Sequence, residues 1–175
     1  MAVSLRDARA APADRRWFAD AYALWAAEMG REAAAAAAAL VAASAASAEP
    51  AREEAARWLA AADAEVLLVL RDGAAAGFAI VERREGGALR RLSEFWIAHG
   101  QRGLGVGRAA VPLILDRHDG EWEIAASASD AAAVRFWRGV VARYAGGRHA
   151  ERLQDGEVRQ RFLARGAPRA SSGAR

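Results

Sequence analysis

A glycine-rich turn between a strand-like and a helix-like segment is the part of the sequence best suited to chemistry. It contains four glycines in eight residues: Gly100, Gly103, Gly105 and Gly107. Glycine costs backbone entropy, so it is expected where the chain needs an unusual conformation or where a ligand must approach the main chain. Amides of such a turn at a helix N-terminus bind phosphate oxygens, and the helix dipole favours the anion. With Arg102 and Arg108 beside it, the turn predicts a site for a pyrophosphate group.

Two other interpretations of this turn are weaker. A tight strand-to-helix connection explains one or two glycines but not all of them. The segment 105–110 fits the loose pattern G-x-G-x-x-A of dinucleotide-binding folds, but too little chain follows it for the further parallel strands of such a fold. The sequence contains no lysine, which excludes a P-loop and Schiff-base chemistry.

Composition indicates one folded domain. The chain has 175 residues, of which 54% are hydrophobic and 27% charged, enough for one core and too few for two ordinary domains. It lacks cysteine and any apolar run of the roughly 20 residues that cross a membrane. The net charge of +3 comes from arginines spread along the chain, so a nucleic-acid partner is not indicated. We expect a cytoplasmic protein with one domain over residues 1–165, no membrane partner, and a disordered tail over 166–175.

Hydrophobic periodicity and turn residues divide the chain into alternating elements. We expect strands at 2–9, 65–71, 76–84, 88–99 and 121–127, a C-terminal hairpin over 150–165, and helices from Asp14, from Pro50, after the glycine turn to about His118, and over 130–144. The alanine-rich stretch 32–49 is expected to be a loose helix or helical loop. The resulting order, β-αα-βββ-α-β-α-ββ, predicts a mixed α/β fold whose sheet is mostly antiparallel and has helices on both faces.

Two motifs at the right separation resemble those of the GNAT superfamily of acetyl-CoA-dependent acyltransferases. The first is Arg102-Gly103-Leu104-Gly105-Val106-Gly107, which is similar to the pyrophosphate signature of that superfamily. The second is Asp130-x-x-Ala133-x-x-Phe136-Trp137, where family members have Asn-x-x-Ala and a Phe-Tyr pair. The specific part of the resemblance covers about residues 88–144, and the element order agrees with it.

The resemblance implies an N-acetyltransferase that moves acetyl from acetyl-CoA directly to a primary amine. Main-chain amides around Ile97 and Ala98 would bind the thioester carbonyl, as acyl transfer requires. The segment 102–108 would hold the pyrophosphate. Asp130, Phe136 and Trp137 would lie along the pantetheine arm. Dimerisation is common in the superfamily, so a homodimer is compatible with the sequence. No metal is expected, because the three histidines lack metal-ligand spacing and cysteine is absent.

A general base must take the proton of the attacking ammonium, and Glu94 is the candidate. Strand alternation places Glu94, Trp96 and Ala98 on one face, with Ser93, Phe95 and Ile97 on the other. The competing interpretation of Glu94 is a solvated or salt-bridged strand residue. The acceptor amine cannot be identified from the sequence, although Trp25 and Trp96 are candidates to line its pocket.

Trp137 departs from the family pattern, because many relatives have a tyrosine there that protonates the leaving thiolate. Indole cannot act as that acid. Tyr144 lies on the same helix face but about 10 Å further along the axis, so it cannot simply replace the missing group. A non-catalytic acyl-CoA-binding domain, acting as a sensor or interaction module, therefore stays as the alternative.

Overall fold

A computed structural model describes residues 1–37 and 48–165, with side chains described for 1–30 and 49–165. In these ranges one sheet of seven strands has the order β1-β2-β3-β4-β5-β7-β6. The strands are β1 (Val3–Asp7), β2 (Ala64–Arg71), β3 (Ala74–Arg84), β4 (Leu89–Ile97), β5 (Gly120–Ser127), β6 (His149–Gln154) and β7 (Glu157–Ala164). Every neighbouring pair is antiparallel except β4 and β5, which are parallel.

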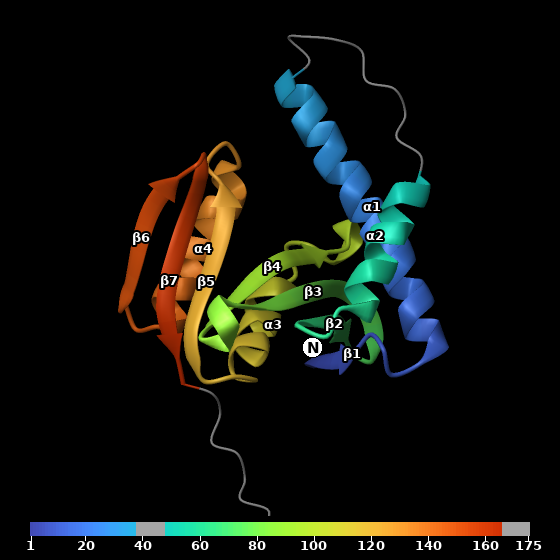
Figure 1. Cartoon of the computed structure of the whole chain (residues 1–175), viewed down its shortest axis with the longest axis horizontal. Helices are drawn as coiled ribbons and strands as arrows, with labels where there is room; N and C mark the ends of the chain where they lie inside the picture. The colour runs from blue at the N-terminus through green and yellow to red at the C-terminus, as the bar shows by residue number, and fades with distance from the viewer. Residues whose placement is uncertain (38–47, 166–175) are drawn as a thin grey trace, which may run out of the picture.

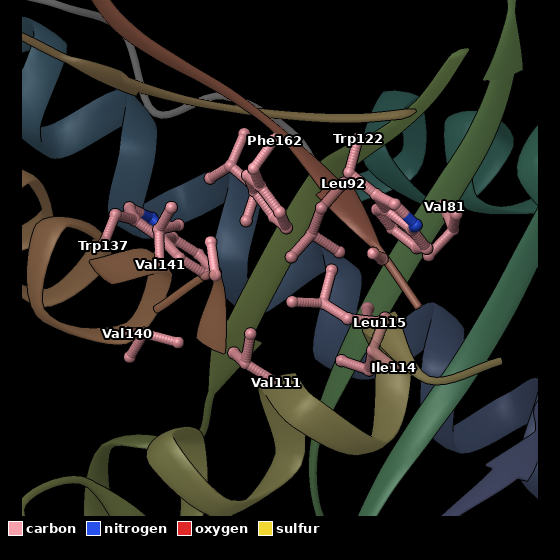
Figure 2. Packing of buried hydrophobic residues seen from close by; sticks show 14 of the residues in the cluster. Val81, Leu92, Val111, Ile114, Leu115, Trp122, Trp137, Val140, Val141 and Phe162 are labelled. Atoms are coloured by element: carbon pink, nitrogen blue, oxygen red, sulfur yellow. The ribbon is translucent and has the colours of Figure 1, made fainter. Parts of the chain in front are cut away.

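Helices cover both faces of this sheet (Figure 1). They are α1 (Pro12–Ala37), α2 (Ala48–Ala60), α3 (Val106–Leu115) and α4 (Ala131–Tyr144). Apolar side chains of α1 and α2 pack with one face of β2, β3 and β4, around Phe18 and Phe78. Side chains of α3 and α4 pack with the opposite face, around Trp122 and Phe162 (Figure 2).

The expected mixed α/β fold and element order are confirmed, and most boundaries agree within two residues. The two hairpin turns at Asp72-Gly73 and Asp155-Gly156 have the positive φ values that favour these residues. Helix α2 begins at Ala48, two residues before Pro50, so Glu49 is the acidic residue of its first turn. Of the alanine-rich stretch, residues 32–37 belong to α1, while 38–47 and the expected tail 166–175 lie outside the described residues.

A β-bulge and a strand divergence open the sheet at its centre. Val81 of β3 is paired with Leu92, but the next pair is Ile80 with Glu94, so Ser93 is an extra residue in β4. The pairing of β4 with β5 ends at Leu92 and Ile124, although both strands continue beyond that point. The last residues of β4 and β5 therefore border an opening between two halves of the sheet (Figure 1).

Candidate active site

The glycine turn forms one wall of a cavity of about 590 Å³, which we call the loop cavity. The opposite wall is formed by Asp130 and the first two turns of α4. Its lining residues are Phe95, Ile97, Gln101, Arg102, Gly103, Gly105, Val106, Gly107, Arg108, Asp130, Ala132, Ala133, Phe136 and Trp137. The sequence-predicted cofactor residues thus gather around one cavity, with the exceptions of Ala98 and the exposed Leu104.

The structure explains the need for glycine differently at different positions of the turn. Gly103 and Gly105 have φ of 75° and 81°, a left-handed conformation that strains other residues. Gly107 lies inside α3, where a Cβ atom would stand 3.3 Å from the Phe136 ring and 3.5 Å from Phe95. Gly100 has neither feature. Gly107 therefore allows α3 to approach α4 and β4 closely.

The N-terminus of α3 opens into the loop cavity. Gly105 is the N-cap residue, and no side chain caps the first-turn amides among the described residues. Such amides carry partial positive charge and suit an anion. Arg108 lies in the same turn, is exposed, and makes no ion pair within the described ranges. This end of the cavity can therefore accept a phosphate group.

Arg102 has a different environment from Arg108. Its Nε donates to the Ile97 carbonyl at 2.8 Å, and its Nη2 donates to Glu28 at 2.6 Å. Glu28, on α1, also accepts from the indole of Trp96 at 2.9 Å. Arg102 therefore joins the glycine turn to α1 and to the end of β4, a role that the sequence did not predict.

One main-chain amide at the end of β4 faces the opening in the sheet. The Ala98 amide donates to the Ala76 carbonyl at 2.9 Å, so it is already used inside the sheet. In an antiparallel pair the residue before a hydrogen-bonded one directs its N–H and C=O away from the partner strand. The Ile97 amide therefore points away from β3, and Ile97 lines the loop cavity.

Glu94 lies at the bulge and is partly buried. Burial raises the pKa of its carboxyl to about 7, with Arg91 opposing and Glu82 reinforcing the shift. Among the described residues it makes no ion pair or hydrogen bond, so the salt-bridged alternative is not observed.

The Ser93 hydroxyl donates to Glu82, which places Ser93 on the same side as Glu94. Simple alternation was wrong for Ser93, because the bulge changes the phase of the strand.

A second cavity, of about 730 Å³, adjoins the loop cavity, and we call it the acidic cavity. It is lined by Glu28, Glu94, Asp130 and Glu157, and also by Trp25 and Trp96 as expected from the sequence. The two cavities share the lining residues Phe95, Ile97, Arg102, Asp130, Ala133 and Trp137. Glu94 borders only the acidic cavity, while Gly103, Gly105 and Gly107 border only the loop cavity.

Asp130 and Trp137 have structural roles in addition to lining both cavities. Asp130 caps α4, and its carboxylate accepts from the amides of Ala132 and Ala133 at 3.0 and 2.9 Å. Trp137 is buried, with its ring centroid 5.4 Å from that of Phe95 and 4.9 Å from that of Phe136. These contacts hold the start of α4 against β4, next to the opening of the sheet.

In the described part of the chain, neither Tyr22 nor Tyr144 lines the loop cavity or the acidic cavity. Tyr144 donates to Asp116 at 2.7 Å, and burial together with this carboxylate raises its pKa. Tyr22 accepts from the Trp58 indole at 3.2 Å, and burial raises its pKa, with the charge of Glu94 adding to the effect. The sequence-based view that Tyr144 cannot replace the missing acid agrees with its bond to Asp116.

Other site types find no support among the described residues. Within 1–30 and 49–165, no group of three or more histidine and acidic side chains is placed to hold a metal ion. No helix in the described part of the chain is long and apolar enough to span a membrane.

Solved structures share this fold, whereas no protein-family model and no curated protein matches the sequence. Aminoglycoside 6′-acetyltransferase type Ii is 12% identical, with a TM-score of 0.65 over 96% of this chain and 100% of that one. The Escherichia coli ribosomal-protein-S18-alanine N-acetyltransferase is 15% identical, with a TM-score of 0.58 over 97% and 98% of the two chains. A GNAT-family acetyltransferase from Staphylococcus aureus is 10% identical, with a TM-score of 0.58 over 93% and 99%. The chain has the fold of the GNAT acetyltransferases, and its substrate subfamily is not identified.

Proposed function

We propose that this chain, as one domain over residues 1–165, is an N-acetyltransferase that uses acetyl-CoA and a primary amine. The observation that carries the proposal is the position of Glu94. Among the described residues it has no ion pair or hydrogen bond, its pKa is about 7, and it lies in the wall of a cavity that adjoins the phosphate-accepting loop cavity. A base whose pKa lies near the working pH is well matched to proton transfer.

The loop cavity suits a pyrophosphate-bearing cofactor such as acetyl-CoA. The uncapped amides of α3 and the exposed Arg108 offer hydrogen bonds and charge to the phosphates. Gly103 and Gly105 line this end of the cavity with main chain alone. Phe136 and Trp137 supply an apolar wall for a pantetheine arm. When bound, the cofactor supplies an acetyl group as an activated thioester.

In the proposed mechanism the chain supplies two groups. The Ile97 amide, directed away from β3, donates to the thioester carbonyl oxygen and stabilises the negative charge that develops there. Glu94 takes a proton from the acceptor ammonium, directly or through water, so that the amine can attack. Trp137 cannot provide a proton to the leaving group. As the new C–N bond forms and the thioester C–S bond breaks, the second proton of the attacking nitrogen would therefore pass to the departing thiolate, directly or through water.

Calorimetric titration with acetyl-CoA, followed by an assay of thiol release with a panel of amines, tests the proposal. Arg108→Glu should weaken acetyl-CoA binding by roughly tenfold or more, because it places an anion at the phosphate-accepting end. Arg143→Glu is the matched control, since Arg143 is exposed at the far end of α4 and lines neither cavity. Acetyl-CoA binding without thiol release for any amine would favour the non-catalytic alternative. Equal effects of the two variants would contradict the cofactor site.

A further inference from the structure

The charged residues of the acidic cavity limit the kind of acceptor that it can take. Among the described residues its walls contain four carboxylates and two guanidinium groups. They are Glu28, Glu94, Asp130 and Glu157, with Arg91 and Arg102. Because carboxylates outnumber guanidinium groups, the cavity favours a positively charged acceptor. Which carboxylate can bind that acceptor depends on the partners that each carboxylate already has.

Three of the four carboxylates already have partners. Glu28 is paired with Arg102 at 2.6 Å. Glu157 is paired with Arg159 at 2.9 Å. Asp130 accepts two amide hydrogen bonds at the start of α4. Using any of them for a ligand would weaken a bond that supports the walls of the cavity.

Glu94 is therefore the one wall carboxylate without a partner among the described residues. It can pair with a single ammonium group while every existing ion pair is kept. A second ammonium on the same molecule would find no other wall carboxylate free among the described residues. It would have to compete with Arg102 for Glu28, with Arg159 for Glu157, or with two amides for Asp130, so a polycation gains little from its extra charges.

Four aromatic residues stand among the uncharged lining residues of the acidic cavity, beside aliphatic residues and serines. Trp25 and Met29 of α1 line one side, and Phe95 and Trp137 line the side shared with the loop cavity. Trp25 is half-buried, and its ring is fixed against Tyr22, with a centroid separation of 4.9 Å. Such walls stabilise an apolar ring by area burial and by aromatic contacts.

We infer that the acceptor is a small primary amine with one positive charge on an apolar, ring-containing body. Its ammonium lies at Glu94 and its ring lies against Trp25. The inference rests on the proposed N-acetyltransferase function, and it adds the substrate class.

Comparison of phenethylamine, ethylamine and spermidine at saturating acetyl-CoA tests the substrate class. We expect kcat/KM for phenethylamine to exceed that for spermidine by about tenfold or more, since each 1.4 kcal/mol of differential binding is a factor of ten. Equal or better use of spermidine would overturn the inference while leaving the N-acetyltransferase proposal intact. Saturation-transfer NMR of the same amines with the protein alone gives a second readout. Preferential binding of spermidine there would likewise overturn it, even if no amine releases thiol and the proposed function fails.

Trp25→Ala isolates the aromatic contact, with Leu24→Ala as its control. Leu24 is the neighbouring residue of α1, is 60% exposed, and lines neither cavity. Trp25→Ala should lower kcat/KM for phenethylamine by about tenfold and for ethylamine by less than about threefold. Leu24→Ala should change neither value. A loss of the same size for both amines would indicate general damage to packing and would contradict a ring at Trp25.

Discussion

The guanidinium of Arg102 and the carboxylate of Glu28 are bonded at 2.6 Å across the boundary between the two cavities. Through this pair the turn that would hold the cofactor is joined to α1, which borders the acceptor side. Because Glu28 also accepts from Trp96, one carboxylate fixes both the glycine turn and an aromatic wall. The two halves of the site are thus held together by a contact between residues 74 positions apart.

Removing this link should affect acceptor binding more than cofactor binding. Glu28→Ala leaves the buried Trp96 indole without its acceptor, and we expect a loss of about 1–3 kcal/mol in the free energy of unfolding. KM for the amine should rise several-fold more than KM for acetyl-CoA. Urea denaturation and steady-state kinetics measure the two effects. Glu54→Ala, which breaks an exposed pair with Arg57 on α2, is the control and should change neither KM.

The pKa of Glu94 predicts how the proposed activity depends on pH. The base acts in its ionised form, so kcat/KM should rise as the pH passes through about 7 and then level off. Glu94→Gln should lower kcat/KM by roughly 10²–10⁴-fold and remove this rise, because the amide cannot accept the proton. An unchanged rate between pH 6 and 9 would show that Glu94 is not the base.

The same shift predicts a change of stability with pH in the opposite direction. The carboxyl of Glu94 ionises at about 4.5 in the unfolded chain and at about 7 in the folded one. Between these values the folded state binds more protons, so the contribution of Glu94 to stability is full below pH 4.5 and is lost as the pH rises to 7. Glu94→Gln should therefore be about 2–3 kcal/mol more stable than wild type at pH 8, with little difference at pH 4. The exposed Glu53→Gln is the control, and urea unfolding at the two pH values measures the difference.

Local chemistry explains which features the sequence predicted well. The turns at Asp72-Gly73 and Asp155-Gly156 fixed two hairpins, and Asp130 indicated the start of α4, because each depends on neighbouring residues alone. The contact between Glu28 and Arg102 could not be predicted, since nothing local distinguishes Glu28 from other helical glutamates. The bulge at Ser93 was missed because it depends on the pairing with β3. For the same reason, only the fold shows that Ala98 donates its amide to Ala76.

Two glycine substitutions should have opposite effects on stability. Gly139 lies within α4 with open space around its Cα, so Gly139→Ala should stabilise the protein by about 0.5–1 kcal/mol. Gly105 has φ of 81°, and Gly105→Ala should destabilise it by about 1–2 kcal/mol. Thermal unfolding of both variants tests the assignment. If Gly105→Ala were neutral, the turn would not need its left-handed conformation.

Trp137 offers a direct test of whether a general acid is missing. Trp137→Tyr places a phenol at the wall shared by the two cavities, at the position where the sequence resemblance implies a general acid. Trp137→Phe places an aromatic ring of the same size there without the hydroxyl. Both variants should lose about 1–3 kcal/mol of stability, because a smaller ring leaves space beside Phe95 and Phe136. If protonation of the leaving thiolate limits the rate, kcat of Trp137→Tyr should exceed that of Trp137→Phe by roughly tenfold or more at pH 7, with the difference disappearing above the pKa of the phenol near 10. Equal kcat values would mean that thiolate departure needs no acid at this position, so the indole is no impediment to the proposed transfer.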